Sequence, residues 1–219
     1  NITDISGNTF TKSASTPLDL KRNTIKPMAA LKIFNMINEF PSDATIENKE
    51  YILGNLENSL EYGVTKGNTL TIKNTTYKGE IGYISFGIYP YSKDPNKGHG
   101  NYTLENVTIK DLTVNSKWGI TNNGRAISIG ALIYGGTSTL KNCTMTGTKL
   151  VGPKNSNGDF VNQYNSVIDD WYDCAIVNSV IATIDGGEYG KLYTYEHAKT
   201  TITGDVKIAL LALESTGSI

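Results

Sequence analysis

The sequence has little cysteine, no long apolar run and no excess of either charge, and each shortage excludes a class of protein. Two cysteines, Cys143 and Cys174, stand without metal-type spacing, so they make no zinc site. The longest clean apolar run, 208–213, is far too short to span a bilayer. Lys+Arg 20 against Asp+Glu 21 leaves no basic excess for nucleic acid or an anionic membrane.

The residues that are abundant favour β structure. Gly (22) and Tyr (13) are frequent, and Thr, Asn and Ile recur along the chain. Thr, Tyr and Ile fit a pleated surface, whereas Asn and Gly fit turns. The 219 residues can bury a sizeable core without a disulfide, and whether the two cysteines pair stays open. Because the chain begins with Asn rather than Met, we expect a mature or excised piece of a longer protein.

Three stretches of the chain are near-copies of one another: "LTIKNTTYKG" (70–79), "YTLENVTIKD" (102–111) and "STLKNCTMTG" (138–147). Aligned on their central Asn, they share a Thr three residues earlier and an apolar residue two residues earlier. Alternation of this kind indicates a strand, and Asn suits a bend because it tolerates left-handed backbone geometry. We therefore predict strand, bend and strand in each copy, with bends at Asn74, Asn106 and Asn142.

Two weaker copies follow, with Gly186 and Gly204 at the bend. Glycine reaches the left-handed region at lower cost than Asn, so the replacement is physically sensible. A second pattern, apolar-Gly-x-apolar, recurs around Gly82 and Gly130. Repeats of this size indicate stacked units that bury their apolar faces on each other. The stack would align Thr71, Thr103 and Thr139 in a ladder.

The pattern L-x-I-x-N-x-T, followed by an aromatic or aliphatic residue and Gly, resembles coils of right-handed parallel β-helix (pectin-lyase-like) proteins. The alternation of residues 129–147 with 78–85 is similar to GLUG-type repeats in surface proteins of gut bacteria, including uncharacterised members. The resemblance covers roughly residues 68–208. It implies secretion or display at a bacterial cell surface, often as one module of a longer chain, and it supplies no catalytic residues.

The N-terminal part differs from the repeats. Residues 27–40 carry apolar residues at helical spacing, and Pro41 follows them, so we predict a helix that caps the first coil. The apolar residues are Met28, Leu31, Phe34 and Ile37. We expect a polar arm or linker over residues 1–25, this cap with lead-in strands over 26–66, and β-helix repeats over 67–219.

One segment carries a hint of catalysis. "VIDDWYDCAIVNS" (167–179) and "GHG" (98–100) resemble the paired-Asp and Gly-His-Gly motifs of β-helix polygalacturonases. Asp169, Asp170 and Asp173 would then be the acids and His99 the helper. The order of the motifs is reversed, however, and the Arg-x-Lys motif of that family is missing. The alternative is a solvated acidic turn.

Three aromatic residues lie in presumed loops and are candidates to stack on sugar rings: Trp118, Trp171 and Tyr91. The sequence shows no calcium-loop spacing, and we expect neither a metal site nor a cofactor. Our expected function is a non-enzymatic, adhesin-like scaffold or display module with a glycan or a host or cell-surface protein as partner. A carbohydrate-binding module and, after it, a polysaccharide lyase or glycoside hydrolase are the alternatives. The sequence names no substrate.

Overall fold

The protein is all-β. The computed structural model describes residues 2–3, 9–10, 36–87, 100–122, 125–127, 131–168, 174–194 and 199–213. The chain divides into two compact units, Asn1–Lys32 and Ile33–Ile219. In the first, β1 (Ile2–Thr3) and β2 (Thr9–Phe10) pair antiparallel. No helix in the described residues is long and apolar enough to cross a membrane.

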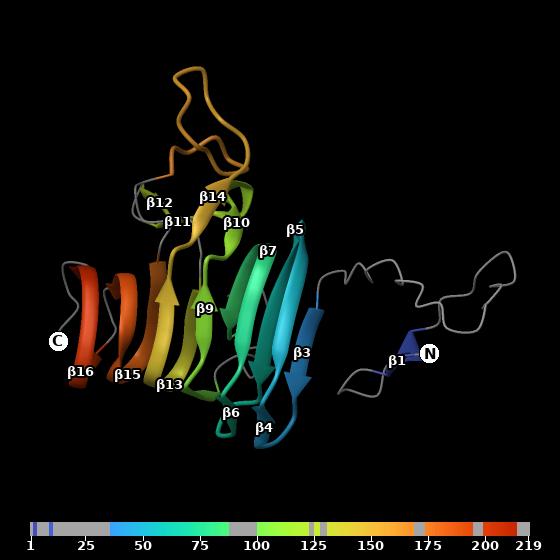
Figure 1. The fold of residues 1–219 in the computed structure, drawn as a ribbon, viewed down its shortest axis with the longest axis vertical. Helices are drawn as coiled ribbons and strands as arrows, with labels where there is room; N and C mark the ends of the chain where they lie inside the picture. The colour runs from blue at the N-terminus through green and yellow to red at the C-terminus, as the bar shows by residue number, and fades with distance from the viewer. Residues whose placement is uncertain are drawn as a thin grey trace, which may run out of the picture. The chain divides into compact units, whose positions relative to one another are not determined.

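The second unit is a row of parallel strands wound around an axis, which runs from β3 at one end to β16 at the other (Figure 1). Every described pairing within its 12-stranded sheet is parallel. Its strands are β3 (Met36–Phe40), β4 (Ala44–Glu47), β5 (Glu50–Val64), β6 (Thr69–Lys73), β7 (Thr76–Phe86), β8 (Asn101–Glu105), β9 (Thr108–Lys110), β10 (Thr113–Asn115), β13 (Ala131–Thr146), β14 (Lys149–Val151), β15 (Cys174–Thr194) and β16 (Lys199–Leu213).

We call one turn of the chain around the axis a pass. Successive passes stack in register, so equivalent residues form rows. One row consists entirely of threonine and contains the predicted ladder: Thr45, Thr71, Thr103, Thr139, Thr183 and Thr201. The next position forms an apolar row whose first five members are buried: Ile46, Ile72, Leu104, Leu140, Ile184 and Ile202. Because neighbouring residues of a strand point to opposite faces, the threonines line the outside and the apolar row fills the core.

The predicted bends are confirmed by the backbone. Asn74, Asn106 and Asn142 have φ of 47°, 53° and 50°, and Gly186 and Gly204 have φ of 72° and 70°. An additional bend lies one pass earlier, and it belongs to the lead-in strands: Asn48, with φ 55°. Left-handed backbone at one corner of every pass is why Asn and Gly recur there.

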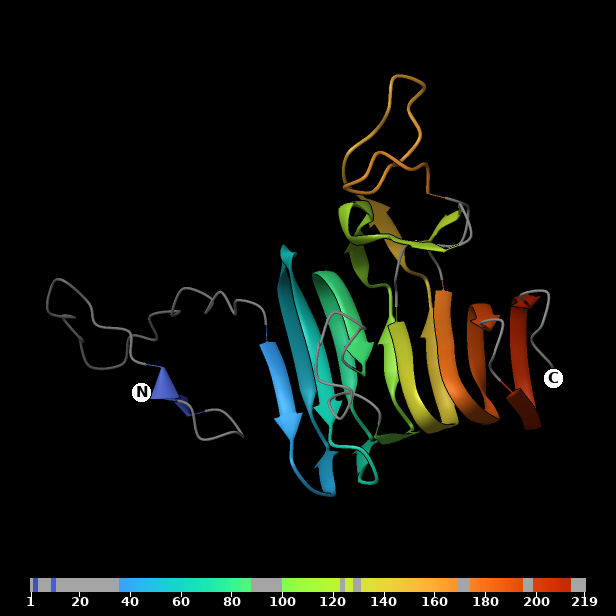
Figure 2. The same cartoon turned by 180° about the vertical axis from the view of Figure 1, so that it is seen from behind.

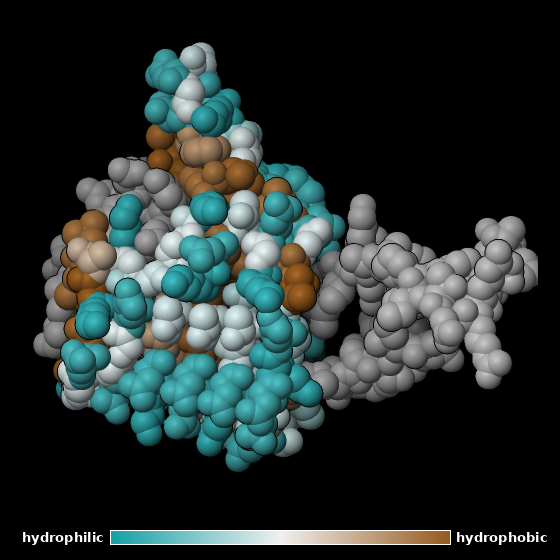
Figure 3. Space-filling model, viewed as in Figure 1, coloured by the Kyte–Doolittle hydropathy of each residue, from teal (hydrophilic) through white to brown (hydrophobic). Residues whose placement is uncertain are grey.

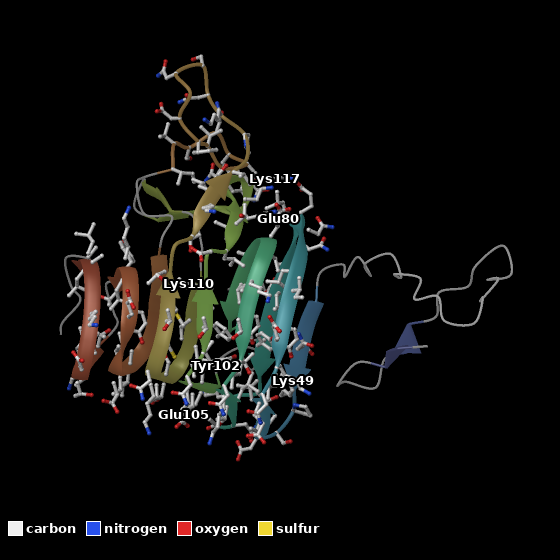
Figure 4. The ribbon with its side chains drawn as sticks, viewed as in Figure 1. Lys49, Glu80, Tyr102, Glu105, Lys110 and Lys117 are labelled. Carbon is white, nitrogen blue, oxygen red and sulfur yellow. The ribbon has the colours of Figure 1, made fainter. Side chains whose placement is uncertain are left out.

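Hydrogen bonds between side chains join the bends of neighbouring passes. Asn106 Nδ2 donates to Asn74 Oδ1 at 3.0 Å, and Asn74 Nδ2 donates to Asn48 Oδ1 at 3.3 Å. The residue before each bend alternates in charge along the row: Glu47, Lys73, Glu105, Lys141 and Asp185. The Glu105 carboxylate lies 3.6 Å from the Nζ of both lysines beside it. Figure 4 labels Glu105 at the lower edge of the stack, where Figure 3 shows a hydrophilic band in the same view.

Tyrosines fill much of the core near β5. Tyr51 and Tyr77 stack with ring centroids 5.0 Å apart, and the Tyr77 hydroxyl donates to the Tyr62 hydroxyl at 3.1 Å. Tyr102 donates its hydroxyl proton to the Tyr62 carbonyl at 3.1 Å and accepts from the Val64 amide at 3.2 Å. These bonds satisfy hydroxyl groups that would otherwise be costly to bury. Tyr77 and Tyr189 each stand three residues after a bend, at Asn74 and at Gly186, and both are buried.

We expect the free energy of unfolding to fall as the pH rises from about 10 toward about 12, because buried tyrosines ionise in the unfolded chain first. Burial raises the pKa of Tyr102 to about 12, and it also raises the pKa of Tyr62, Tyr77 and Tyr189 from the usual 10.0. Below pH 10 this stabilising contribution is fully present, and it is lost as the pH rises through the folded pKa values. Urea unfolding at several pH values measures it, and a Tyr102→Phe variant should show a shallower decline. A flat profile over this range would contradict the prediction.

Cys143 is buried at the position that Val107 holds one pass earlier, and its Sγ contacts the Leu104 carbonyl at 3.4 Å. Burial raises the pKa of its thiol from 9.0 to about 11. In a Cys174→Ser background, we expect alkylation at neutral pH to be about a hundredfold slower in the folded protein than in urea, because the thiolate is the reactive form. Mass spectrometry of iodoacetamide-treated protein measures the rate, and equal rates would contradict the burial.

The predicted helix over 27–40 is wrong where the structure describes it. Residues 36–40 form strand β3, which pairs in parallel with residues 60–64 of β5. Asn38 is buried and Glu39 exposed, which is the period of a strand. Apolar residues at helical spacing were outweighed by an available sheet edge. The rest of the predicted helix lies outside the described residues.

The second sequence pattern was aligned one residue out of register. The structure pairs Ile84 with Ala131 and Phe86 with Ile133, so Gly82 corresponds to position 129 rather than to Gly130. Both stretches nevertheless belong to one ladder, which residues 175–179 of β15 continue. The shared glycine was a coincidence of spacing.

Candidate functional site

Most of the predicted site residues lie outside the described residues. These are the catalytic candidates His99, Asp169, Asp170 and Asp173, and the aromatic candidates Tyr91 and Trp171. The structure therefore neither brings the four catalytic candidates together nor separates them. Trp118 is the one candidate that is described, and it lies in the 3-10 turn η1 (Ser116–Trp118).

Trp118 packs against the strand below it. A Cβ on Gly82 would lie 2.7 Å from the ring carbon Cδ1, so only a glycine lets the indole approach this closely. The ring is partly buried, and its buried Nε1 finds no hydrogen-bond acceptor within the described part of the chain. Trp118 is therefore held against Gly82 with part of its surface exposed, rather than standing free on a loop.

Charged and amide groups fix the turn that carries Trp118. Lys117 Nζ lies 2.7 Å from Glu57 Oε2 and 5.0 Å from the centroid of the Trp118 ring, which is a cation–π distance. Asn115 caps the turn: its Oδ1 accepts from the Lys117 amide at 3.1 Å, and its Nδ2 donates to the Leu56 carbonyl at 3.2 Å. Figure 4 shows Lys117 at the foot of the protruding segment.

The segment 152–168 protrudes from the stack (Figure 2). It contains two similar turns built on asparagine. Asn155 Oδ1 accepts from the amides of Asn157 and Asp159, at 2.9 and 3.0 Å. Asn162 Oδ1 accepts in the same way from the amides two and four residues later, at 2.9 and 3.0 Å. These bonds give the segment a defined shape without a core of its own.

The protruding segment is joined to the turn at 115–119. The Ser116 hydroxyl donates to the Val161 carbonyl at 2.9 Å, and the Gln163 amide donates to the Lys117 carbonyl at 3.0 Å. Asn162 Nδ2 also donates to the Gly119 carbonyl at 3.3 Å. The two segments therefore form one surface, which we call the corner surface: residues 56–57, 115–119 and 152–168.

The corner surface has an exposed apolar part. Tyr164 is 67% exposed and Val167 is 47% exposed. In Figure 3 hydrophobic residues gather at the base of the protrusion, while its tip is hydrophilic. An exposed aromatic ring beside amide groups is suited to contact a partner that is part apolar and part polar.

A buried carboxylate lies elsewhere, on β5. Glu61 Oε1 accepts from the Tyr83 hydroxyl at 2.6 Å and from the Ser59 hydroxyl at 3.0 Å. Burial, and then the bond to Glu61, raise the pKa of Tyr83 above its usual value, so its phenol stays a hydrogen-bond donor. In the described residues no group of three His, Cys, Asp or Glu is placed to hold a metal ion.

The sequence prediction missed Glu57, Lys117, Asn162 and Tyr164. Glu57 and Lys117 belong to no motif and meet only because the passes stack. The two asparagine turns could have been found from the sequence, because the stretches "NSNGD" (155–159) and "NQYNS" (162–166) are similar.

No family model matches the chain, and comparison with curated proteins and with solved structures gave no significant match.

Proposed function

We propose that residues 33–219 form a right-handed parallel β-helix that serves as a non-enzymatic binding scaffold in a secreted or cell-surface protein. The corner surface carries this proposal. Two of its segments, which follow β10 and β14, leave the stack at equivalent positions, because β10 and β14 pair residue for residue. Binding residues commonly lie in loops that a rigid framework positions.

The parallel stacking of the strands supports the description of the fold as a right-handed β-helix. Each pass returns beside the previous one in parallel, and parallel crossovers in a sheet are right-handed in the great majority of proteins. The resemblance to GLUG-type repeats, and the surface location that it implies, belong to this proposal.

A carbohydrate-binding module is the second candidate. The exposed Tyr164 ring and the partly exposed Trp118 ring lie on segments that hydrogen-bond to one another. Aromatic faces with amides nearby suit a sugar, which presents apolar faces and a rim of hydroxyl groups. Under this second candidate the protein is still a binding scaffold, and the ligand of its corner surface is a carbohydrate.

Binding to a glycan array and to immobilised cell-surface proteins tests the proposal. We expect a wild-type signal that falls at least about tenfold in Tyr164→Ala and Lys117→Ala, as for central residues of an interface. The matched control is Ile181→Ala, which removes an exposed apolar side chain on the threonine side of the stack. Signal on glycans favours the carbohydrate module, and signal on proteins alone favours an adhesin-like role.

The enzymatic alternative needs its own measurement. Release of reducing ends from the polysaccharides of the array, compared between wild type and Asp170→Asn, tests it directly. Release that disappears in Asp170→Asn would overturn the non-enzymatic proposal. A wild-type signal lost equally in Ile181→Ala would show that the corner surface is not the binding site.

A further inference from the structure

Both ends of the stack leave a sheet edge without a partner in the described part of the chain. At the C-terminal end, β16 pairs only with β15, and at the N-terminal end, β4 pairs only with β6. An open edge of this kind presents unpaired amide and carbonyl groups that template pairing with another strand. Among the described strands β3 and β14 also have a single partner each, whereas β16, and β4 with the start of β5, form the edges at the two ends of the stack.

The core is also incompletely covered at both ends. Ile184 is 0% exposed and Tyr189 is 1% exposed, yet their β16 partners Ile202 and Ile208 are only partly buried. Tyr51 at the opposite end is likewise partly buried, whereas its partner Tyr77 is fully buried. Figure 3 shows hydrophobic residues over β16 at the left of the view. Covering these side chains would remove apolar surface from water, which is favourable.

The first and last passes are equivalent in register, and their charges are complementary. The ladder that begins at Glu50 ends at Lys207, through residues 76, 108, 144 and 188. Two positions before the threonine row, Asp43 stands at the N-terminal end and Lys199 at the C-terminal end. All four side chains are exposed.

We propose that a second copy of this chain docks end to end, with β16 of one copy alongside β4 and the start of β5 of the next. In this register Lys207 faces Glu50 of the next copy, and Lys199 faces its Asp43. Ile208 covers the open face of the next Tyr51, and the threonine row continues without a break. The chain already forms ion pairs of this kind between its own neighbouring passes, where Lys78 pairs with Glu50 and Lys73 with Glu105.

The contact is heterologous, because the C-terminal end of one copy meets the N-terminal end of another. Such contacts do not close into a dimer, and because this one continues the stack along its own axis, it repeats into an open filament rather than a ring. End-to-end docking buries the two edges and leaves the corner surface of every copy exposed. A filament would therefore present the corner surface repeatedly, although this inference does not depend on what that surface binds.

Sedimentation velocity on the full chain over a wide concentration range tests the proposal. We expect wild type to form a series of species larger than a dimer as its concentration rises. Two charge-reversed variants provide the decisive comparison: a C-end variant, Lys199→Glu with Lys207→Glu, and an N-end variant, Asp43→Lys with Glu50→Lys. In each variant alone, like charges meet at the contact, and we expect association to weaken by roughly tenfold or more.

In a mixture of the two variants, the reversed C-terminal end of one can meet the reversed N-terminal end of the other, and the two unchanged ends can also meet. Opposite charges then face each other at every contact, so we expect association of the mixture to recover. Circular dichroism of each variant checks that the fold survives the loss of the Asp43 bond to the Thr69 amide and of the Glu50–Lys78 pair. A wild type that stays monomeric at every concentration would overturn the proposal. Variants that associate as wild type does, or a mixture of folded variants that fails to recover, would overturn it too.

Discussion

Replacing Leu104 with alanine is expected to lower the free energy of unfolding by about 2–5 kcal/mol. Leu104 is 0% exposed and lies in the apolar row between Ile72 and Leu140 of the neighbouring passes. Truncation loses the burial of the side chain and leaves a cavity, which two flanking passes locked in register cannot collapse to fill. Urea unfolding followed by circular dichroism measures the change.

The matched control is the adjacent residue, Thr103. Its side chain points outward in the threonine row and is partly exposed. We expect Thr103→Ala to change the free energy of unfolding by only about 0.5 kcal/mol, as for most surface substitutions. Equal losses for the two variants would show that the strand does not alternate between core and surface as described.

The second large effect is expected at Gly187, immediately after a bend. Its φ is 109°, and a Cβ there would lie 2.3 Å from the Cys143 carbonyl oxygen on the neighbouring pass. An alanine therefore meets both an unfavourable backbone conformation and a backbone atom that the ladder fixes. We expect Gly187→Ala to cost about 3 kcal/mol or more, since the conformation alone costs about 1–2 kcal/mol and the contact with the Cys143 carbonyl adds to it. Thermal and urea unfolding measure it.

A comparison with Gly67 separates the cost of the backbone conformation from the cost of the contact with the neighbouring pass. Its φ is 88°, but nothing lies within 4 Å of the position that a Cβ would occupy. We expect Gly67→Ala to cost only about 1–2 kcal/mol, which is the price of left-handed backbone. The difference between the two variants measures the contact between passes, and a Gly67 variant that is the more damaging would contradict the stack.

The repeat made the outer and inner rows predictable from the sequence. Asn74, Asn106 and Asn142 set the phase, because left-handed backbone tolerates few residue types, and the neighbouring positions then alternate between Thr outside and an apolar residue inside. The pass around Asn48 was missed as a copy because Glu50 stands where the three strongest copies have Thr. The signal was present in Thr45, Ile46 and Tyr51.

The helix prediction failed for a physical reason that the sequence alone does not reveal. Apolar residues at helical spacing express a local preference, whereas the strand at 36–40 gains its stability from residues 60–64 of β5, which lie far along the chain. The alignment of Gly82 with Gly130 failed because two glycines matched by chance, and register is decided by the neighbouring pass.

The corner surface was only partly predictable. Trp118 was identified as a loop aromatic, yet its packing on Gly82 and its neighbour's pairing with Glu57 depend on residues brought together by stacking. Nothing in the local sequence around residue 57 indicates the partner at 117. Sites assembled between passes are visible only once the register is known.

Engineered disulfides between passes test the stacked register most directly. In a background with Cys143→Ala and Cys174→Ala, we expect Thr71→Cys with Thr103→Cys to oxidise readily, because paired neighbours lie within the Cα separation that a disulfide requires. Thr71→Cys with Glu105→Cys is two residues out of register and is expected to resist oxidation. Equal oxidation of both pairs, or a preference for the out-of-register pair, would contradict the stack.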